Sequence, residues 1–189
     1  MASFLVAHEK TAITEGGYAN SPDDRGGETY KGISRVYQPG WTGWTLVDAA
    51  QLKPGFPETL DDDSSLHALV MGFYRGLWGC MGLDALQRQS LADKVYDAAV
   101  NMGPNRAGMF LQEAMNLLNR REELWPDIPE DGHIGPRTIA VMRMLDDRAD
   151  LVEVMFNGLR VTYYGRIMKE DPSQEIHATT WLRRSNDIA

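Results

Sequence analysis

The sequence is poor in the residues that form disulfides and metal sites. Its 189 residues include one cysteine and four histidines. Cys80 has no partner for an internal disulfide, and its Leu-Trp-Gly-Cys-Met context predicts a thiol packed in the core. Because the histidines have no metal-ligand spacing, we expect no metal and no cofactor.

Long apolar runs are also missing. No run approaches the ~20 residues that cross a bilayer, so we expect no membrane insertion. The first residues lack the charged start and apolar run of a secretory signal, which predicts synthesis in the cytoplasm without a signal peptide.

Positive charge is scarce, with 19 Lys and Arg against 27 Asp and Glu and a formal net charge of −8. This balance argues against nucleic acid as a partner. Two local groups of cations, Lys31 with Arg35 and Arg183 with Arg184, are candidates for contact with an anionic surface. The length fits one compact unit, and we expect a monomer.

Apolar residues recur at helical spacing along much of the chain. We predict helices over residues 3–14, 64–77, 90–102, 104–118, 137–146 and 150–168. The aspartates Asp61–Asp63 precede the second helix and are typical of dipole partners at a helix start rather than of a metal site. Pro104 suits a first helical position. Trp181 is expected to pin the last segment, residues 176–186, to the core.

Residues 14–33 interrupt this helical pattern. The stretch is rich in Gly, Asp and Pro and closes with a short β-like segment. Gly16 and Gly17 permit backbone angles that other residues disfavour, so the turn after Glu15 can be sharp. A carboxyl at this helix end can be half-buried, which raises its pKa and suits a general acid. An isolated Glu before two glycines is more often solvated. The assignment of Glu15 as a general acid therefore depends on the residues that accompany it at fixed spacing.

Those neighbours are Asp24 and Thr29. Glycosidic cleavage needs a proton donor for the leaving oxygen and a group opposite that holds water or the cation-like sugar. Glu15 facing Asp24 and Thr29 across a hairpin would supply both parts. Phage-type lysozymes have a Glu, an Asp and a Thr at very similar spacing, with one more residue between Asp and Thr. The second carboxylate therefore stays open between Asp23, Asp24 and Glu28.

The two tryptophans Trp41 and Trp44, and the side chain of Gln112, each have two interpretations. Trp41 and Trp44 lie in a stretch, residues 34–44, that we expect to be a loop, where they would be sugar platforms or core residues. Residues 45–60 are expected to hold at most a short helix. Gln112 is expected to be solvated or to face a binding site.

Three separated motifs resemble glycoside hydrolase family 108. They are Glu15-Gly-Gly-Tyr18 with the segment Pro22–Ile33, then Asp97–Pro104, then Asp131–Thr138, which is similar to the family's C-terminal peptidoglycan domain. The resemblance implies a predominantly helical α+β, lysozyme-like fold with a small β-hairpin beside the catalytic Glu. It also implies a catalytic part at residues 1–102 and a peptidoglycan-binding helical part at residues 103–189.

The same resemblance implies an N-acetylmuramidase that hydrolyses the β-1,4 bond between N-acetylmuramic acid and N-acetylglucosamine. Glu15 would be the general acid, with Asp24 and Thr29 as catalytic partners. Tyr18, Tyr30 and Asn101 are the predicted substrate contacts. The glycan strands of peptidoglycan would be the partner.

Several alternatives stay open. A lytic transglycosylase also needs one catalytic Glu, and a non-catalytic wall-binding protein of a secretion system would need none. Either retention or inversion is compatible with the motifs. Without a signal, an enzyme acting in the periplasm or wall would be released through a phage holin or a secretion system.

Overall fold

The computed structural model describes residues 1–12, 17–20 and 27–186, and the chain forms two compact units. We call His8–Gly76 the sheet unit. The helical unit consists of Met1–Ala7 and the chain from Leu77 onward. The fold is predominantly helical with a small antiparallel sheet, which confirms the predicted α+β class. The predicted functional division at residues 102 and 103 stays a prediction.

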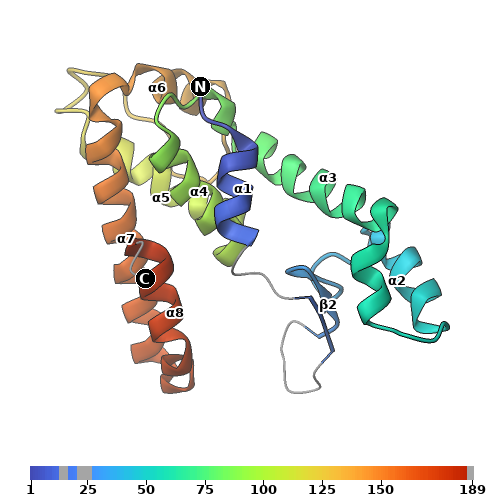
Figure 1. The fold of residues 1–189 in the computed structure, drawn as a ribbon. Helices are drawn as coiled ribbons and strands as arrows, with labels where there is room; N and C mark the ends of the chain where they lie inside the picture. The colour runs from blue at the N-terminus through green and yellow to red at the C-terminus, as the bar shows by residue number, and fades with distance from the viewer. Residues whose placement is uncertain (13–16, 21–26, 187–189) are drawn as a thin grey trace. The chain divides into compact units, whose positions relative to one another are not determined.

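Most of the described chain is helical (Figure 1). The elements in chain order are α1 (Phe4–Ala12), β1 (Tyr18–Ala19), β2 (Thr29–Tyr30), β3 (Ile33–Ser34), α2 (Gly43–Gln51), η1 (Glu58–Asp62), α3 (Ser64–Cys80), η2 (Leu83–Ala85), α4 (Gln89–Met102), α5 (Pro104–Leu117), α6 (Pro136–Met144), η3 (Asp146–Arg148), α7 (Ala149–Glu170), η4 (Pro172–His177) and α8 (Ala178–Asn186). The chain passes from one unit to the other within α1 and again within α3.

The sheet of the sheet unit has the strand order β1-β2-β3, and both pairs are antiparallel. β2 and β3 are joined by Lys31 and Gly32, which have φ angles of 47° and 78°. Two successive positive φ angles are typical of the tight hairpin turn that matches strand twist. The hydroxyl of Tyr74 on α3 donates to the Lys31 carbonyl at 2.7 Å, which holds this turn against the helix.

α3 begins where the aspartate cluster predicts. The Oδ1 atom of Asp63 accepts hydrogen bonds from the backbone N–H groups of Ser65 at 2.9 Å and Leu66 at 3.0 Å. This is the N-cap arrangement, which satisfies donors that the first turn leaves free. The helix continues to Cys80, and the prediction of a core thiol there is wrong. Cys80 is exposed because the buried face of this turn is occupied by Trp78.

The stretch before α2 also differs from expectation. A nine-residue helix begins at Gly43, so Trp44 lies in its first turn and not in a loop. The Trp44 side chain is 3% exposed, and its Nε1 donates to the Gln38 carbonyl at 2.8 Å. Thr42 occupies the N-cap position, but its side chain makes no capping hydrogen bond.

The helical unit is built around α4, which packs against α5 and α7. Periodicity predicts that five residues of α4 point inward. Four of them, Leu91, Val95, Ala98 and Ala99, are buried, whereas Met102 at the end of the helix is half-buried. α8 packs on α7 through Trp181, whose ring stacks on Tyr164 at 4.7 Å and 17°. The expected anchoring of the last segment is therefore confirmed.

The turn at residues 131–133 is fixed to α5 by Gln112. This side chain has no exposed surface, so the expectation that it is solvated or faces a binding site is wrong. Its Oε1 accepts from the Gly132 N–H at 2.7 Å, and its Nε2 donates to the His133 carbonyl at 3.0 Å. A buried amide that binds both sides of a turn replaces the hydrogen bonds that the turn cannot make internally.

Within residues 1–12, 17–20 and 27–186, no helix has the length and apolar character needed to cross a membrane.

Candidate active site

Three of the predicted site residues lie in the sheet of the sheet unit. Tyr18 on β1 pairs with Tyr30 on β2, and Thr29 pairs with Ala19. Asn101 lies at the end of α4, in the helical unit. Glu15, Asp23 and Asp24 lie outside the described residues, so their predicted roles stay predictions.

β1 and β2 lie on either side, in the sequence, of the segment that carries the predicted aspartates. β1 ends at Ala19 and β2 begins at Thr29, and these two residues face each other in the ladder. The pairing places the side chains of Tyr18 and Tyr30 on one face of the sheet and that of Thr29 on the other. Each strand has only two residues, so contacts of the neighbouring side chains must contribute to the stability of the hairpin.

Glu28, the residue before β2, is the centre of one such set of contacts. Its carboxylate accepts hydrogen bonds from the Tyr18 hydroxyl at 3.1 Å and from Gln51 Nε2 at 2.8 Å. Its second oxygen lies 2.6 Å from Nε of Arg35, and the side chain is 15% exposed. Tyr18, Gln51 and the Arg35 guanidinium therefore hold the Glu28 side chain in place beside β2, which gives it a structural role.

Tyr18 belongs to the same cluster and remains partly exposed. Burial raises the pKa of its hydroxyl, and the hydrogen bond to Glu28 raises it further. The ring packs edge-on against Phe56 at a centroid distance of 4.7 Å. Tyr18 is therefore a neutral donor held in place at neutral pH, and its predicted contact with substrate stays a prediction.

Tyr30 occupies the core of the sheet unit. Its side chain is 1% exposed, and its hydroxyl donates to the Leu60 carbonyl at 3.2 Å. Burial raises its pKa to about 12, with further contributions from the charges of Asp61 and Asp63. The structure therefore gives Tyr30 a packing role, and its predicted contact with substrate stays a prediction.

Thr29 is half-buried, and its Oγ1 donates to the Gly27 carbonyl at 3.2 Å. A hydroxyl that donates in this way keeps its lone pairs as acceptors. Such a group can orient a water molecule or a sugar hydroxyl beside the hairpin.

The end of α4 carries a second polar cluster. Asn101 Oδ1 accepts from the Tyr164 hydroxyl at 2.9 Å, which fixes the orientation of the amide. One turn earlier, Asp97 binds Arg160 Nη2 at 2.7 Å and Arg184 Nη2 at 2.9 Å. Asn101 is partly exposed, so its amide nitrogen is available as a donor, and its predicted contact with substrate stays a prediction.

Arg160 is the residue of this cluster that the sequence analysis missed. It has no exposed surface and lies on α7 between Phe156 and Tyr164, at the spacing of one helix face. A signal was present, because an arginine within an apolar stripe requires a buried carboxylate as its partner. Asp97 on the buried helix α4 is such a carboxylate.

The cations proposed for contact with an anionic surface are mostly paired. Lys31 Nζ lies 2.8 Å from Asp61, and Arg35 binds both Glu28 and Asp48. Arg184 is paired with Asp97. These pairs cancel much of the local positive charge in the described part of the chain.

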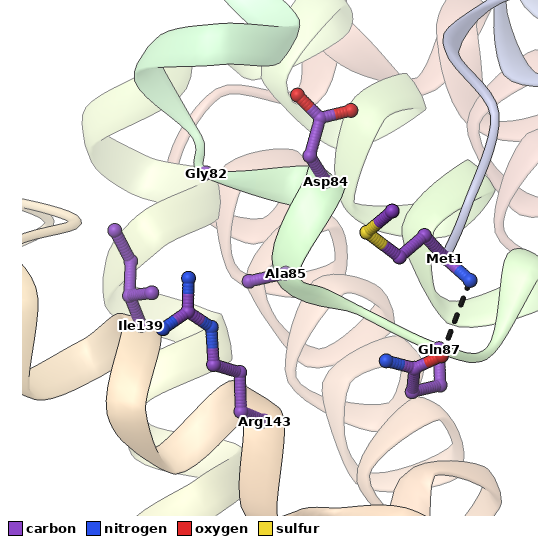
Figure 2. A pocket seen from close by; sticks show the side chains of 7 residues that line it. All are labelled: Met1, Gly82, Asp84, Ala85, Gln87, Ile139 and Arg143. Atoms are coloured by element: carbon purple, nitrogen blue, oxygen red, sulfur yellow. Dashed lines mark hydrogen bonds between the residues drawn. The ribbon is translucent and has the colours of Figure 1, made fainter.

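A pocket of about 460 Å³ lies in the helical unit (Figure 2). Its lining residues come from the chain start, η2 and α6: Met1, Gly82, Asp84, Ala85, Gln87, Ile139 and Arg143. Asp84 accepts a hydrogen bond from Trp78 Nε1 at 2.8 Å, so its carboxylate is already engaged. The pocket contains none of the predicted site residues and lacks a pair of carboxylates. The described residues also include no group of three or more His, Cys, Asp or Glu that could hold a metal ion.

Comparison with known proteins gives matches over nearly the whole chain. Residues 8–103 match the family model described as Glycosyl hydrolase 108, and residues 106–186 match the one described as Predicted Peptidoglycan domain. Among solved structures, that of Brucella abortus SagA has a TM-score of 0.64 and 22% sequence identity, over 97% of this chain and 90% of that chain. This likeness shows a shared fold. A search of curated proteins gave no match.

Proposed function

Because the chain belongs to glycosyl hydrolase family 108, we propose that it is an N-acetylmuramidase that hydrolyses peptidoglycan. The bond cleaved would be the β-1,4 linkage between N-acetylmuramic acid and N-acetylglucosamine. The family match over residues 8–103 carries this proposal, since it spans Glu15, Asp24 and Thr29. The match of residues 106–186 to a peptidoglycan domain supports the same polymer as substrate.

In this mechanism Glu15 protonates the glycosidic oxygen as the sugar develops oxocarbenium character. Asp24 and Thr29 position the attacking water or stabilise the cation-like carbon. The acceptor lone pairs of Thr29 support this role, since its hydroxyl proton is directed to the Gly27 carbonyl. The hydrogen bonds from Tyr18 and Gln51 and the ion pair with Arg35 support a structural role for Glu28. We therefore propose Asp24 as the second catalytic group, with Asp23 as the alternative.

The first test compares wall lysis by the wild type and Glu15→Gln. We expect the variant to fold normally and to lose lysis by a factor on the order of 10² or more, as for removal of a general acid. Turbidity of a suspension of purified peptidoglycan measures the rate. Asp24→Asn and Asp23→Asn form a matched pair, and only Asp24→Asn should lower the rate.

Mass analysis of the released fragments identifies the reaction. Reducing N-acetylmuramic acid ends indicate hydrolysis, whereas 1,6-anhydro ends would identify a lytic transglycosylase. If the Glu15→Gln variant lysed the wall at the wild-type rate, Glu15 would have no part in the mechanism. If neither protein lysed the wall but both sedimented with it, the protein would be a wall-binding module.

A further inference from the structure

Two tryptophans near the start of α2 differ in exposure. Trp44 is a core residue, with 3% of its side chain exposed. Trp41, in the loop just before the helix, is partly exposed. The two indoles therefore have different roles, and Trp41 is the one that can reach a ligand.

The Trp41 ring is held in place from two sides. It makes a T-shaped contact with Trp44, at an interplanar angle of 88° and a centroid distance of 5.1 Å. The ring also lies against the backbone of Gly43, where an added Cβ would come within 2.3 Å of Cζ2 and Cη2. Only glycine at position 43 permits this approach. An exposed aromatic ring that is already fixed loses little side-chain entropy when it binds.

A continuous set of contacts connects Trp41 with the predicted catalytic hairpin. Trp44, on which Trp41 packs, lies under the Arg35 guanidinium at 4.4 Å. Arg35 binds Glu28, the residue directly before Thr29. All of these residues belong to the sheet unit.

We propose that Trp41 binds the glycan by stacking on a sugar ring. The C–H groups on one face of an N-acetylhexosamine are apolar and match the flat surface of an indole, while the sugar hydroxyls and amides remain hydrated at the rim. Trp41 is thus a substrate-binding residue beside the hairpin, outside the bond-breaking step. The assignment rests on the proposed function for the identity of the polymer.

The test is calorimetric binding of a peptide-free tetrasaccharide of alternating N-acetylglucosamine and N-acetylmuramic acid. The Glu15→Gln protein is the parent, so that the ligand is not consumed. We expect Trp41→Ala to raise Kd about tenfold, the size expected for loss of one aromatic stacking contact of about 1.5 kcal/mol. Trp41→Phe, which keeps a smaller ring, should have an intermediate effect.

Gly43→Ala tests the positioning of the ring, since it leaves Trp41 in place but removes its backbone support. We expect a weaker affinity here too. Tyr37→Ala is the matched control, because Tyr37 is an aromatic residue of the same loop, 68% exposed, and should leave Kd unchanged. Circular dichroism and the melting temperature verify that each variant is folded.

The results separate this inference from the proposed function. If Glu15→Gln lyses the wall like the wild type but the Trp41 variants bind the glycan weakly, the stacking role of Trp41 is supported. The assignment of Glu15 as general acid then fails. Parent-like Kd in folded Trp41→Ala would overturn the stacking role. It would also be overturned if Tyr37→Ala weakened binding equally, or if the parent did not bind the tetrasaccharide.

Discussion

Arg160 has its whole side chain buried, so its charge depends on contacts within the protein. Asp97, 14% exposed, supplies the nearest negative charge, and the Tyr164 hydroxyl lies 3.5 Å from Arg160 Nη2. The Nε and Nη1 groups of Arg160 have no hydrogen-bond acceptor in the described part of the chain. Asp97 is therefore the main compensation for burying this guanidinium.

We expect Asp97→Asn to lower the free energy of unfolding by about 3 kcal/mol or more, because it leaves a buried charge without its partner. Denaturant unfolding followed by circular dichroism measures this change. Glu170→Gln is the control, since Glu170 pairs with Arg166 at 3.8 Å on the surface, with both side chains more than half exposed. That change should cost about 0.5 kcal/mol or less. Equal losses in both variants would contradict the special role of Asp97.

At the scale of elements, the contact of α5 with the turn at residues 131–133 depends on Gly108. A Cβ at this position would lie 2.4 Å from the Gly132 carbonyl oxygen, which is backbone and cannot rotate away. Gly132 itself has a φ of 77°, which favours glycine. The motif beginning at Asp131 is thus a docking turn, fixed by glycines on both sides of the contact and by Gln112.

Gly108→Ala therefore has two opposing effects. Alanine is the better helix former by about 1 kcal/mol, but the overlap with Gly132 costs about 1–3 kcal/mol. We expect a net loss of stability, seen as a lower melting temperature. Gly158→Ala on α7 is the matched control, since nothing lies within 4 Å of its added Cβ, and it should raise stability. A gain in both variants would show that the turn shifts freely on α5.

Some helices could be predicted from the sequence, whereas the environments of some of their side chains could not. Periodicity and caps were sufficient for α3 and α4, because Asp63 is a strong cap and Leu91, Val95 and Ala98 repeat on one face. They failed for Trp44, because Pro39, Gly40 and Gly43 favour a loop although α2 begins at Gly43. They failed for Gln112, because only the folded turn supplies its partners. A side chain whose role depends on a distant segment leaves no local pattern.

For the candidate site, the sequence predicted the hairpin and placed Thr29 on it. It did not predict that Tyr30 is a core residue or that Glu28 is held by Tyr18, Gln51 and Arg35. Both facts depend on segments more than twenty residues away, Leu60 for Tyr30 and Gln51 for Glu28. Motif position alone therefore cannot separate a substrate contact from a packing residue.

At the scale of the whole molecule, the net charge is −8. The stem peptides of peptidoglycan, the proposed substrate, also carry carboxylates. Several cations that could attract such a surface are already paired, among them Lys31, Arg35 and Arg184. If peptidoglycan is the substrate as proposed, we therefore expect a repulsive long-range field that lowers the rate of encounter with this polymer. Repulsion of this kind is screened by salt, since the Debye length falls from about 30 Å at 0.01 M to about 8 Å at 0.15 M.

We expect the initial rate of wall lysis to rise, roughly twofold or more, as NaCl increases from 10 to 150 mM at subsaturating substrate. A basic enzyme that depends on attraction to the wall would show a fall over the same range. Binding of uncharged N-acetylglucosamine oligomers is the control and should be nearly independent of salt, because no charge is screened. A fall in the rate of wall lysis would mean that an unpaired cationic surface controls the encounter despite the net charge.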